Sequence, residues 1–182
     1  MIIMIKILGI DDFSEIYNKR LVNDFPESEV KSLKKIIDMY KKDMYFVYGY
    51  YNENGELAGY AFFINDRTKD TVLLDYFAIV PEKRSSGIGS EFLGKIKEKI
   101  ADSGNRLILE VENPEYAEDG PAKDYMIKRI GFYKKNDMKV AASATYLEST
   151  HIGLTRCKSI KAEGYRLVKD DVVYRIIDCN PQ

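Results

Sequence analysis

The segment from Leu73 to Lys99 constrains the fold more than any other part of the chain. Residues 73–80 are apolar at nearly every position, which is typical of a strand covered on both faces. Pro81 ends this strand, and a turn with the sequence Arg84-Ser85-Ser86-Gly87-Ile88-Gly89 follows. Apolar residues then recur at helical spacing, at Ile88, Phe92, Leu93, Ile96 and Ile100. The segment therefore predicts a strand, a glycine-bearing turn and an amphipathic helix.

This order of elements suits the binding of a phosphate group. The N–H groups in the first turn of a helix have no partner within the helix, and the helix dipole favours an anion there. Gly87 and Gly89 would let the backbone come close to the anion, because neither carries a Cβ atom. The alternative interpretation is an ordinary connection between a strand and a helix.

Composition favours a soluble globular protein with one domain over residues 1–182. Of the 182 residues, 45% are hydrophobic and 31% are charged, and a chain of this length can bury a core. The net charge of -1 gives no electrostatic reason to expect nucleic acid as a partner. Residues 1–10 are apolar but too few to span a membrane. We interpret the distant Cys157 and Cys179 as free thiols of a cytoplasmic protein without a metal site.

The remaining patterns predict an α/β protein with a mixed sheet. The expected strands cover residues 4–8, 45–51, 57–64, 73–80, 106–112 and 139–147, with a last one within 165–178. Phe25-Pro26 separates two early helices, the first capped by Asp11 or Asp12, and further helices are expected from residue 88 and over 125–134. Residues 148–164 form a variable insert or loop without a readable pattern.

Two blocks of this sequence resemble the GNAT superfamily of acetyl-CoA-dependent N-acetyltransferases. The first is Arg84-x-x-Gly87-x-Gly89, placed between a predicted strand and a predicted helix. The second is Gly131-Phe132-Tyr133-Lys134-Lys135, in the helix after the fifth strand, where Asp137-Met138 replaces the Gly-Phe usual in the family. The element order also matches, up to about Val140. The resemblance implies a single GNAT-like domain with a mixed seven-stranded sheet flanked by about four helices.

The resemblance also implies a site for acetyl-CoA, used as a co-substrate without a metal. Backbone groups of Phe77, Ile79 and Val80 would bond the pantetheine arm as if it were an additional strand. The N–H groups of the turn and first helical residues would hold the pyrophosphate, namely those of Arg84, Ser85, Ser86, Gly87, Ile88, Gly89 and Ser90.

The expected chemistry is acetyl transfer to a primary amine. The resemblance assigns protonation of the leaving thiolate to Tyr133, and a strand N–H near Phe77 could bond the oxyanion. Asp75, Glu110 and Glu112 are candidates for the general base, with Glu27 near the acceptor corner. The alternative for each carboxylate is a structural pair with Arg106 or Arg129, and for Tyr133 a packed helical tyrosine.

Two functions follow from these expectations. The first is an N-acetyltransferase that acts by direct attack in a ternary complex, with a small-molecule or peptide amine as acceptor. The second is an acyl-CoA-binding sensor or assembly module without turnover. The superfamily often dimerises through its last strands, so the resemblance also implies a homodimer. His151 is interpreted as a solvated loop residue.

Overall fold

The computed structural model describes residues 4–65, 71–112, 114, 117–145 and 173–178, with side chains up to residue 138. The chain divides into two compact units. The first consists of Met1–Arg67 and Val72–Ile96, and the second of Thr68–Thr71 and Lys97–Gln182. The insert 148–164, His151 and both cysteines lie outside the described residues.

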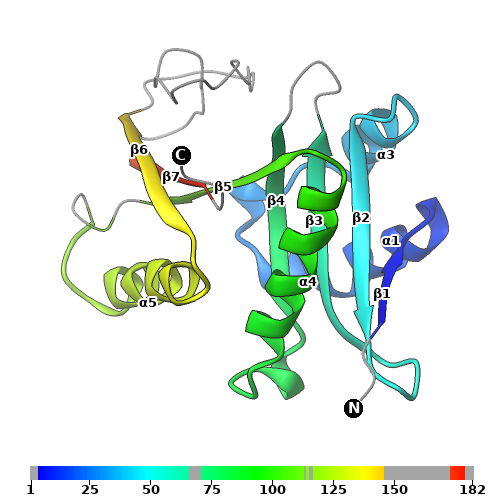
Figure 1. Cartoon of the computed structure of the whole chain (residues 1–182), viewed down its shortest axis with the longest axis horizontal. Coiled ribbons are helices and arrows are strands. Elements are labelled where there is room, and N and C mark those ends of the chain that lie inside the picture. The colour runs from blue at the N-terminus through cyan, green and yellow to red at the C-terminus, as the bar shows by residue number, and fades with distance from the viewer. Residues whose placement is uncertain (1–3, 66–70, 113, 115–116, 146–172, 179–182) are drawn as a thin grey trace. The chain divides into compact units, whose positions relative to one another are not determined.

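The first unit contains an antiparallel sheet in the order β1-β2-β3-β4 (Figure 1). Its strands are β1 Met4–Ile7, β2 Tyr45–Tyr51, β3 Leu57–Asn65 and β4 Thr71–Ile79. A hairpin with Gly55 at a φ of 77° joins β2 to β3, as Asn54-Gly55 predicts. The register pairs Tyr45 with Ile64 and Gly59 with Ile79.

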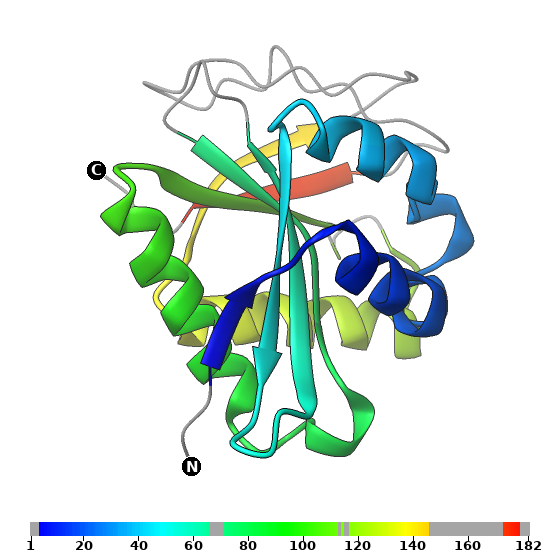
Figure 2. The same cartoon turned by 90° about the vertical axis from the view of Figure 1, so that its right-hand side faces the viewer.

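The helices of the first unit lie on opposite faces of this sheet (Figure 2). One face carries α1 Ile10–Ile16, the π-helical turn η1 Tyr17–Leu21, α2 Val22–Asp24, the 3-10 turn η2 Glu27–Glu29 and α3 Leu33–Tyr40. Phe13 of α1 packs against Phe62 of β3 with ring centroids 6.2 Å apart. On the other face lies α4 Ile88–Asp102, whose Phe92 stacks on Tyr50 at 4.4 Å.

Local signals explain most helix boundaries. The first helical region ends at Asp24 because Phe25 is extended before Pro26, as expected from the restriction that proline places on its predecessor. Ser32 caps α3, and its side chain accepts a hydrogen bond from the Lys35 N–H. The expectation that Asp11 or Asp12 caps α1 was wrong: Gly9 occupies the cap without a side-chain cap bond, and both aspartates lie in the first turn of the helix.

The second unit contains the strands β5 Arg106–Glu112, β6 Lys139–Thr145 and β7 Val173–Asp178, and the helix α5 Pro121–Lys135. Both pairings are antiparallel, with Leu109 opposite Ile177 in β5 and β7 and Ala142 opposite Ile176 in β6 and β7. The predicted strand 106–112 is confirmed at both ends. Helix α5 begins four residues before the predicted start, with Pro121 in its first turn.

The predicted α/β class is confirmed, and so is the order of helices and strands along the chain. Four α-helices of seven residues or more are described, α1, α3, α4 and α5. The single mixed seven-stranded sheet stays a prediction, because it requires a parallel pair between a strand of each unit. None of the described helices is long and apolar enough to cross a membrane.

Candidate active site

The turn between β4 and α4 has the geometry of an anion site. After the 3-10 turn η3 Pro81–Lys83, Ser85 and Gly87 adopt positive φ angles of 61° and 86°. The first helical bonds run from the N–H groups of Ser90 and Glu91 to the Gly87 oxygen, at 3.0 and 3.1 Å. The N–H groups of Ile88 and Gly89 therefore come before the first bonds of α4, and they have no acceptor within the helix.

The conformation of Gly87 explains why a glycine occupies this position. A Cβ atom added there would meet no protein atom within 4 Å, so the surrounding space does not demand a glycine. The φ of 86° at Gly87 favours glycine, since L-residues rarely adopt a positive φ of this size. Residues 84–87 are exposed, whereas Ile88 is buried and anchors the start of the helix to the core.

Arg84 connects the turn to two other elements of the first unit. Its Nε donates to the Ile79 oxygen at 2.9 Å, and its Nη2 lies 3.1 Å from Asp24 Oδ1. The other carboxylate oxygen of Asp24 accepts from the hydroxyl of buried Tyr60 at 2.7 Å. The guanidinium thus links the turn to the end of β4 and to α2, although 53% of the Arg84 side chain is exposed.

The three residues expected to bond pantetheine differ in the direction of their backbone groups relative to β3. The Val80 N–H donates to the Ala58 oxygen at 3.0 Å, so this pair is hydrogen-bonded across β3 and β4. Because bonded pairs alternate in an antiparallel ladder, the N–H and C=O groups of Phe77 and Ile79 point away from β3. Phe77 and Ile79 therefore present backbone groups away from the strand partner, whereas the Val80 donor is used within the protein.

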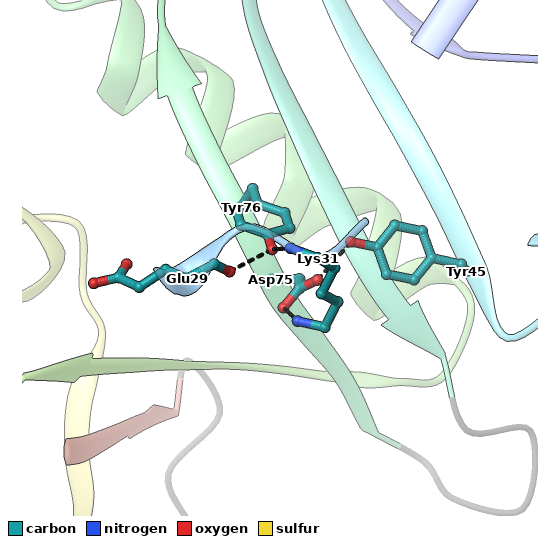
Figure 3. A network of polar contacts seen from close by, with 5 residues as sticks. All are labelled: Glu29, Lys31, Tyr45, Asp75 and Tyr76. Carbon is teal, nitrogen blue, oxygen red and sulfur yellow. Dashed lines mark hydrogen bonds and ion pairs between the residues drawn. The ribbon is translucent and has the colours of Figure 1, made fainter. Parts of the chain in front are cut away.

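Asp75 lies in the same strand, and both of its carboxylate oxygens are engaged (Figure 3). Oδ1 lies 2.7 Å from Lys31 Nζ, and Oδ2 accepts from the Tyr45 hydroxyl at 2.5 Å. Only 8% of the Asp75 side chain is exposed, and 17% of the Lys31 side chain. Proton transfer from an amine to Asp75 would therefore compete with these two partners.

Glu110, Glu112 and Tyr133 belong to the second unit. Glu112, at the end of β5, forms an ion pair with Arg129 of α5, as the structural alternative anticipated. Glu110 is half-buried on the same strand, opposite Ile176 of β7. Tyr133 lies one helical turn after Arg129, and the charges of Arg129 and Glu112 both act on its hydroxyl. Glu112 is therefore the ion-pair partner of Arg129, and Tyr133 lies within range of both charges.

Burial changes the acidity of Tyr133. The side chain is only 7% exposed, and burial raises the pKa of its hydroxyl to about 12. Tyr133 is thus protonated throughout the physiological range, as a proton donor must be. Transfer of its proton to a thiolate of pKa ~8.5 is uphill by roughly 5 kcal/mol, so this tyrosine would be a weak acid.

Several buried tyrosines give the protein a predicted sensitivity to alkali. Burial also raises the pKa values of the Tyr45, Tyr60 and Tyr76 hydroxyls. The folded protein therefore keeps these protons to higher pH than the unfolded chain, whose tyrosines titrate near pH ~10. We expect the free energy of unfolding to be unaffected by these groups below pH ~10 and to fall as the pH rises above it. Urea denaturation at pH 8 and pH 10.5, with ultraviolet titration of tyrosinate, measures this; equal stability at both values would contradict it.

Sequence patterns did not identify the partners of the site residues. Lys31, Tyr76, Asp24 and Tyr60 were not expected there, and Tyr45 was expected only as a residue of the strand 45–51. One signal was available: a carboxylate such as Asp75 inside an apolar strand requires a charged or hydrogen-bonding partner. The sequence does not show which residue supplies it.

The fold and the turn define an α/β protein in which a turn with positive φ angles joins a strand to the N-terminus of a helix. The model of the acetyltransferase (GNAT) family matches residues 10–135. The chain belongs to this family, which confirms the resemblance drawn from the two sequence blocks, and it is an acyltransferase. Proteins of the family use acetyl-CoA. Among curated proteins, the sequence has no significant match.

Solved structures share the fold at low sequence identity. A Bacteroides thetaiotaomicron protein assigned to the GNAT family as an acetyltransferase has a TM-score of 0.67 and 15% identity, covering 98% of this chain and 88% of its own. A Bacillus subtilis acetyltransferase in complex with CoA has a TM-score of 0.61 and 17% identity, with 100% of both chains covered. The spermidine/spermine N-acetyltransferase SpeG from Vibrio cholerae, in complex with manganese ions, has a TM-score of 0.60 and 12% identity, over 97% and 91% of the chains.

Proposed function

We propose that the protein is an N-acetyltransferase that moves the acetyl group of acetyl-CoA to a primary amine by direct attack in a ternary complex. The strand–turn–helix at residues 77–90 is the observation that carries this proposal, in a chain that belongs to the GNAT family. The proposal includes a single domain whose strands join into one mixed sheet. The Bacillus subtilis structure in complex with CoA supports the choice of acetyl-CoA as donor.

The binding part of the proposal uses the backbone of the first unit. Phe77 and Ile79 direct their backbone groups away from β3, where an extended pantetheine arm could bond them, although the Ile79 oxygen already accepts from Arg84 Nε. The N–H groups at the start of α4 would hold the pyrophosphate, and the helix dipole adds to this attraction. Arg84 would keep the turn in place through Asp24 and the Ile79 oxygen.

The chemical part requires three proton and charge movements. A neutral amine nitrogen attacks the thioester carbon, so an ammonium of pKa ~10.4 must first lose a proton. The Phe77 N–H would bond the oxyanion, and breaking the C–S bond then releases a thiolate that takes a proton from Tyr133. Asp75, Glu110 and Glu112 are the candidates for the general base, and the first and last of these are held in ion pairs with Lys31 and Arg129, with which proton transfer would compete.

Release of free thiol from acetyl-CoA tests the proposal directly. We expect saturable release that depends on one class of amine, in a panel of polyamines, amino sugars, amino acids and peptides. Spermidine belongs in the panel because a similar structure is a spermidine/spermine N-acetyltransferase. A thermal-shift titration with CoA measures binding separately. CoA binding without turnover across the panel would contradict acetyl transfer, and absence of CoA binding would contradict the donor site as well.

A further inference from the structure

Four residues of the first unit form one hydrogen-bonded group, which we name the Asp75 network: Lys31, Tyr45, Asp75 and Tyr76 (Figure 3). Asp75 bonds Lys31 Nζ and the Tyr45 hydroxyl. The Tyr76 hydroxyl accepts from the Lys31 N–H and donates to the Glu29 oxygen, both at 2.8 Å. Lys31 Nζ also lies 5.3 Å from the centroid of the Tyr76 ring, within the range of a cation–π contact.

An irregularity in β4 places Asp75 in this network. Phe62 of β3 pairs with Tyr76 and Phe63 pairs with Leu74, so the register gives Asp75 no partner residue on β3. This is a β-bulge, which allows a side chain to change direction. Consecutive strand residues normally point to opposite faces, yet Asp75 and Tyr76 both contact Lys31. The bulge therefore lies where two consecutive residues of β4 both reach Lys31.

The same network fixes the segment between η2 and α3. Residues 30–32 belong to no helix or strand. The Tyr76 hydroxyl bonds the Glu29 oxygen and the Lys31 N–H, and the Tyr17 hydroxyl donates to the Lys31 oxygen at 3.0 Å. Side chains from β4 and η1 thus supply the bonds that regular structure would otherwise provide. Residues 29–31 are clamped to the bulge.

The bulge is two residues from Phe77, whose N–H the proposed function assigns to the oxyanion. On the opposite face, the Phe77 ring packs against Phe92 at 5.4 Å. We propose that Asp75 is a positioning residue: through Lys31 and Tyr45 it holds the bulge, and the bulge sets the direction of the Phe77 N–H. This inference rests on the proposed function. In this role, Asp75 keeps its ion pair with Lys31 and does not take a proton from the amine as a general base would.

Shape-conserving variants of the full-length protein test this role. Asp75→Asn and Tyr45→Phe remove the charge or the hydroxyl, and Lys31→Arg is the conservative variant that keeps the ion pair. We expect kcat with acetyl-CoA and the best amine to fall about 10- to 100-fold in Asp75→Asn and Tyr45→Phe, because small misplacements of reacting groups cost up to ~100-fold. In Lys31→Arg we expect kcat to stay near the wild-type value. The pH profile of kcat/KM should keep its shape. Tyr48→Phe, on the opposite face of β2, and Lys19→Met, in an exposed pair with Glu15, are the matched controls.

Hydrogen–deuterium exchange gives a readout that does not depend on turnover. We expect exchange in residues 25–32 and 74–77 to rise in Asp75→Asn and Tyr45→Phe, with residues 88–96 unchanged. Unchanged exchange in both variants would overturn the clamp. A loss of kcat above ~1,000-fold in Asp75→Asn, with the ascending pH limb abolished, would make Asp75 the base instead. If the wild type turned over no amine, the proposed function would fail, while exchange would still decide the clamp.

Discussion

Replacing Tyr133 with phenylalanine is expected to lower kcat by about 100-fold at neutral pH. A general acid contributes about 10²- to 10⁴-fold, and the raised pKa of Tyr133, about 12, places the expected loss at the lower end of this range. The ring stays in place among its buried neighbours, so the free energy of unfolding should change little. Steady-state release of CoA measures the first quantity, and urea denaturation measures the second.

Tyr125→Phe is the control for this variant. Tyr125 lies in the same helix, α5, but its side chain is 64% exposed, so removal of its hydroxyl should leave kcat unchanged. A second check uses pH. Because Tyr133 releases its proton only near pH ~12, wild-type kcat should show no descending limb from this residue up to pH 10. Full activity of Tyr133→Phe would show that the tyrosine has only a packing role.

Replacing Gly87 with valine is expected to weaken CoA binding by at least about tenfold, which corresponds to ~1.4 kcal/mol of binding free energy. A branched L-residue is strained at a φ of 86°, so the turn should change conformation and redirect the N–H groups that come before the first bonds of α4. Loss of one hydrogen bond to a charged group costs about 1.5–3 kcal/mol, which is sufficient for the predicted effect. Isothermal titration with CoA measures it.

Gly55→Val separates the loss of binding from the loss of stability. Gly55 has a φ of 77°, and a Cβ atom there would also meet nothing within 4 Å, so its backbone strain matches that at Gly87. Both variants should lose about 1–2 kcal/mol of stability, but only Gly87→Val should lose affinity for CoA. Equal affinity in both folded variants would contradict the phosphate role of the turn.

Sequence reasoning succeeded where a short stretch of chain carries its own signal. Pro26 separates the early helices, Asn54-Gly55 marks a hairpin, and the alternation of residues 106–112 defines β5. Each of these depends on backbone restrictions within a few residues. The cap of α1 was predicted wrongly because two aspartates stand where the helix has already begun, and sequence alone does not distinguish the cap from the first turn.

The block after α5 shows how the structure explains a departure from the family pattern. Asp137 stands where the family usually has glycine, and it adopts a φ of 61°, a conformation that aspartate tolerates better than most residues. Met138, in the place of phenylalanine, is buried. In this chain, Asp137 adopts a positive φ that glycine also accommodates, and Met138 places an apolar side chain in the core.

By itself, the sequence determined the family, the order of helices and strands, and the glycine turn at residues 84–90, because these depend on periodicity and on local backbone restrictions. Only the tertiary structure decided which of the candidate carboxylates are held in ion pairs. It pairs Asp75 with Lys31, which is 44 residues away, and Glu112 with Arg129, 17 residues away. Such pairs depend on a bulge and on the packing of helix against strand, which residue spacing does not encode. Two of the three carboxylates that the sequence offered as bases, Asp75 and Glu112, are partners of cations in the folded protein.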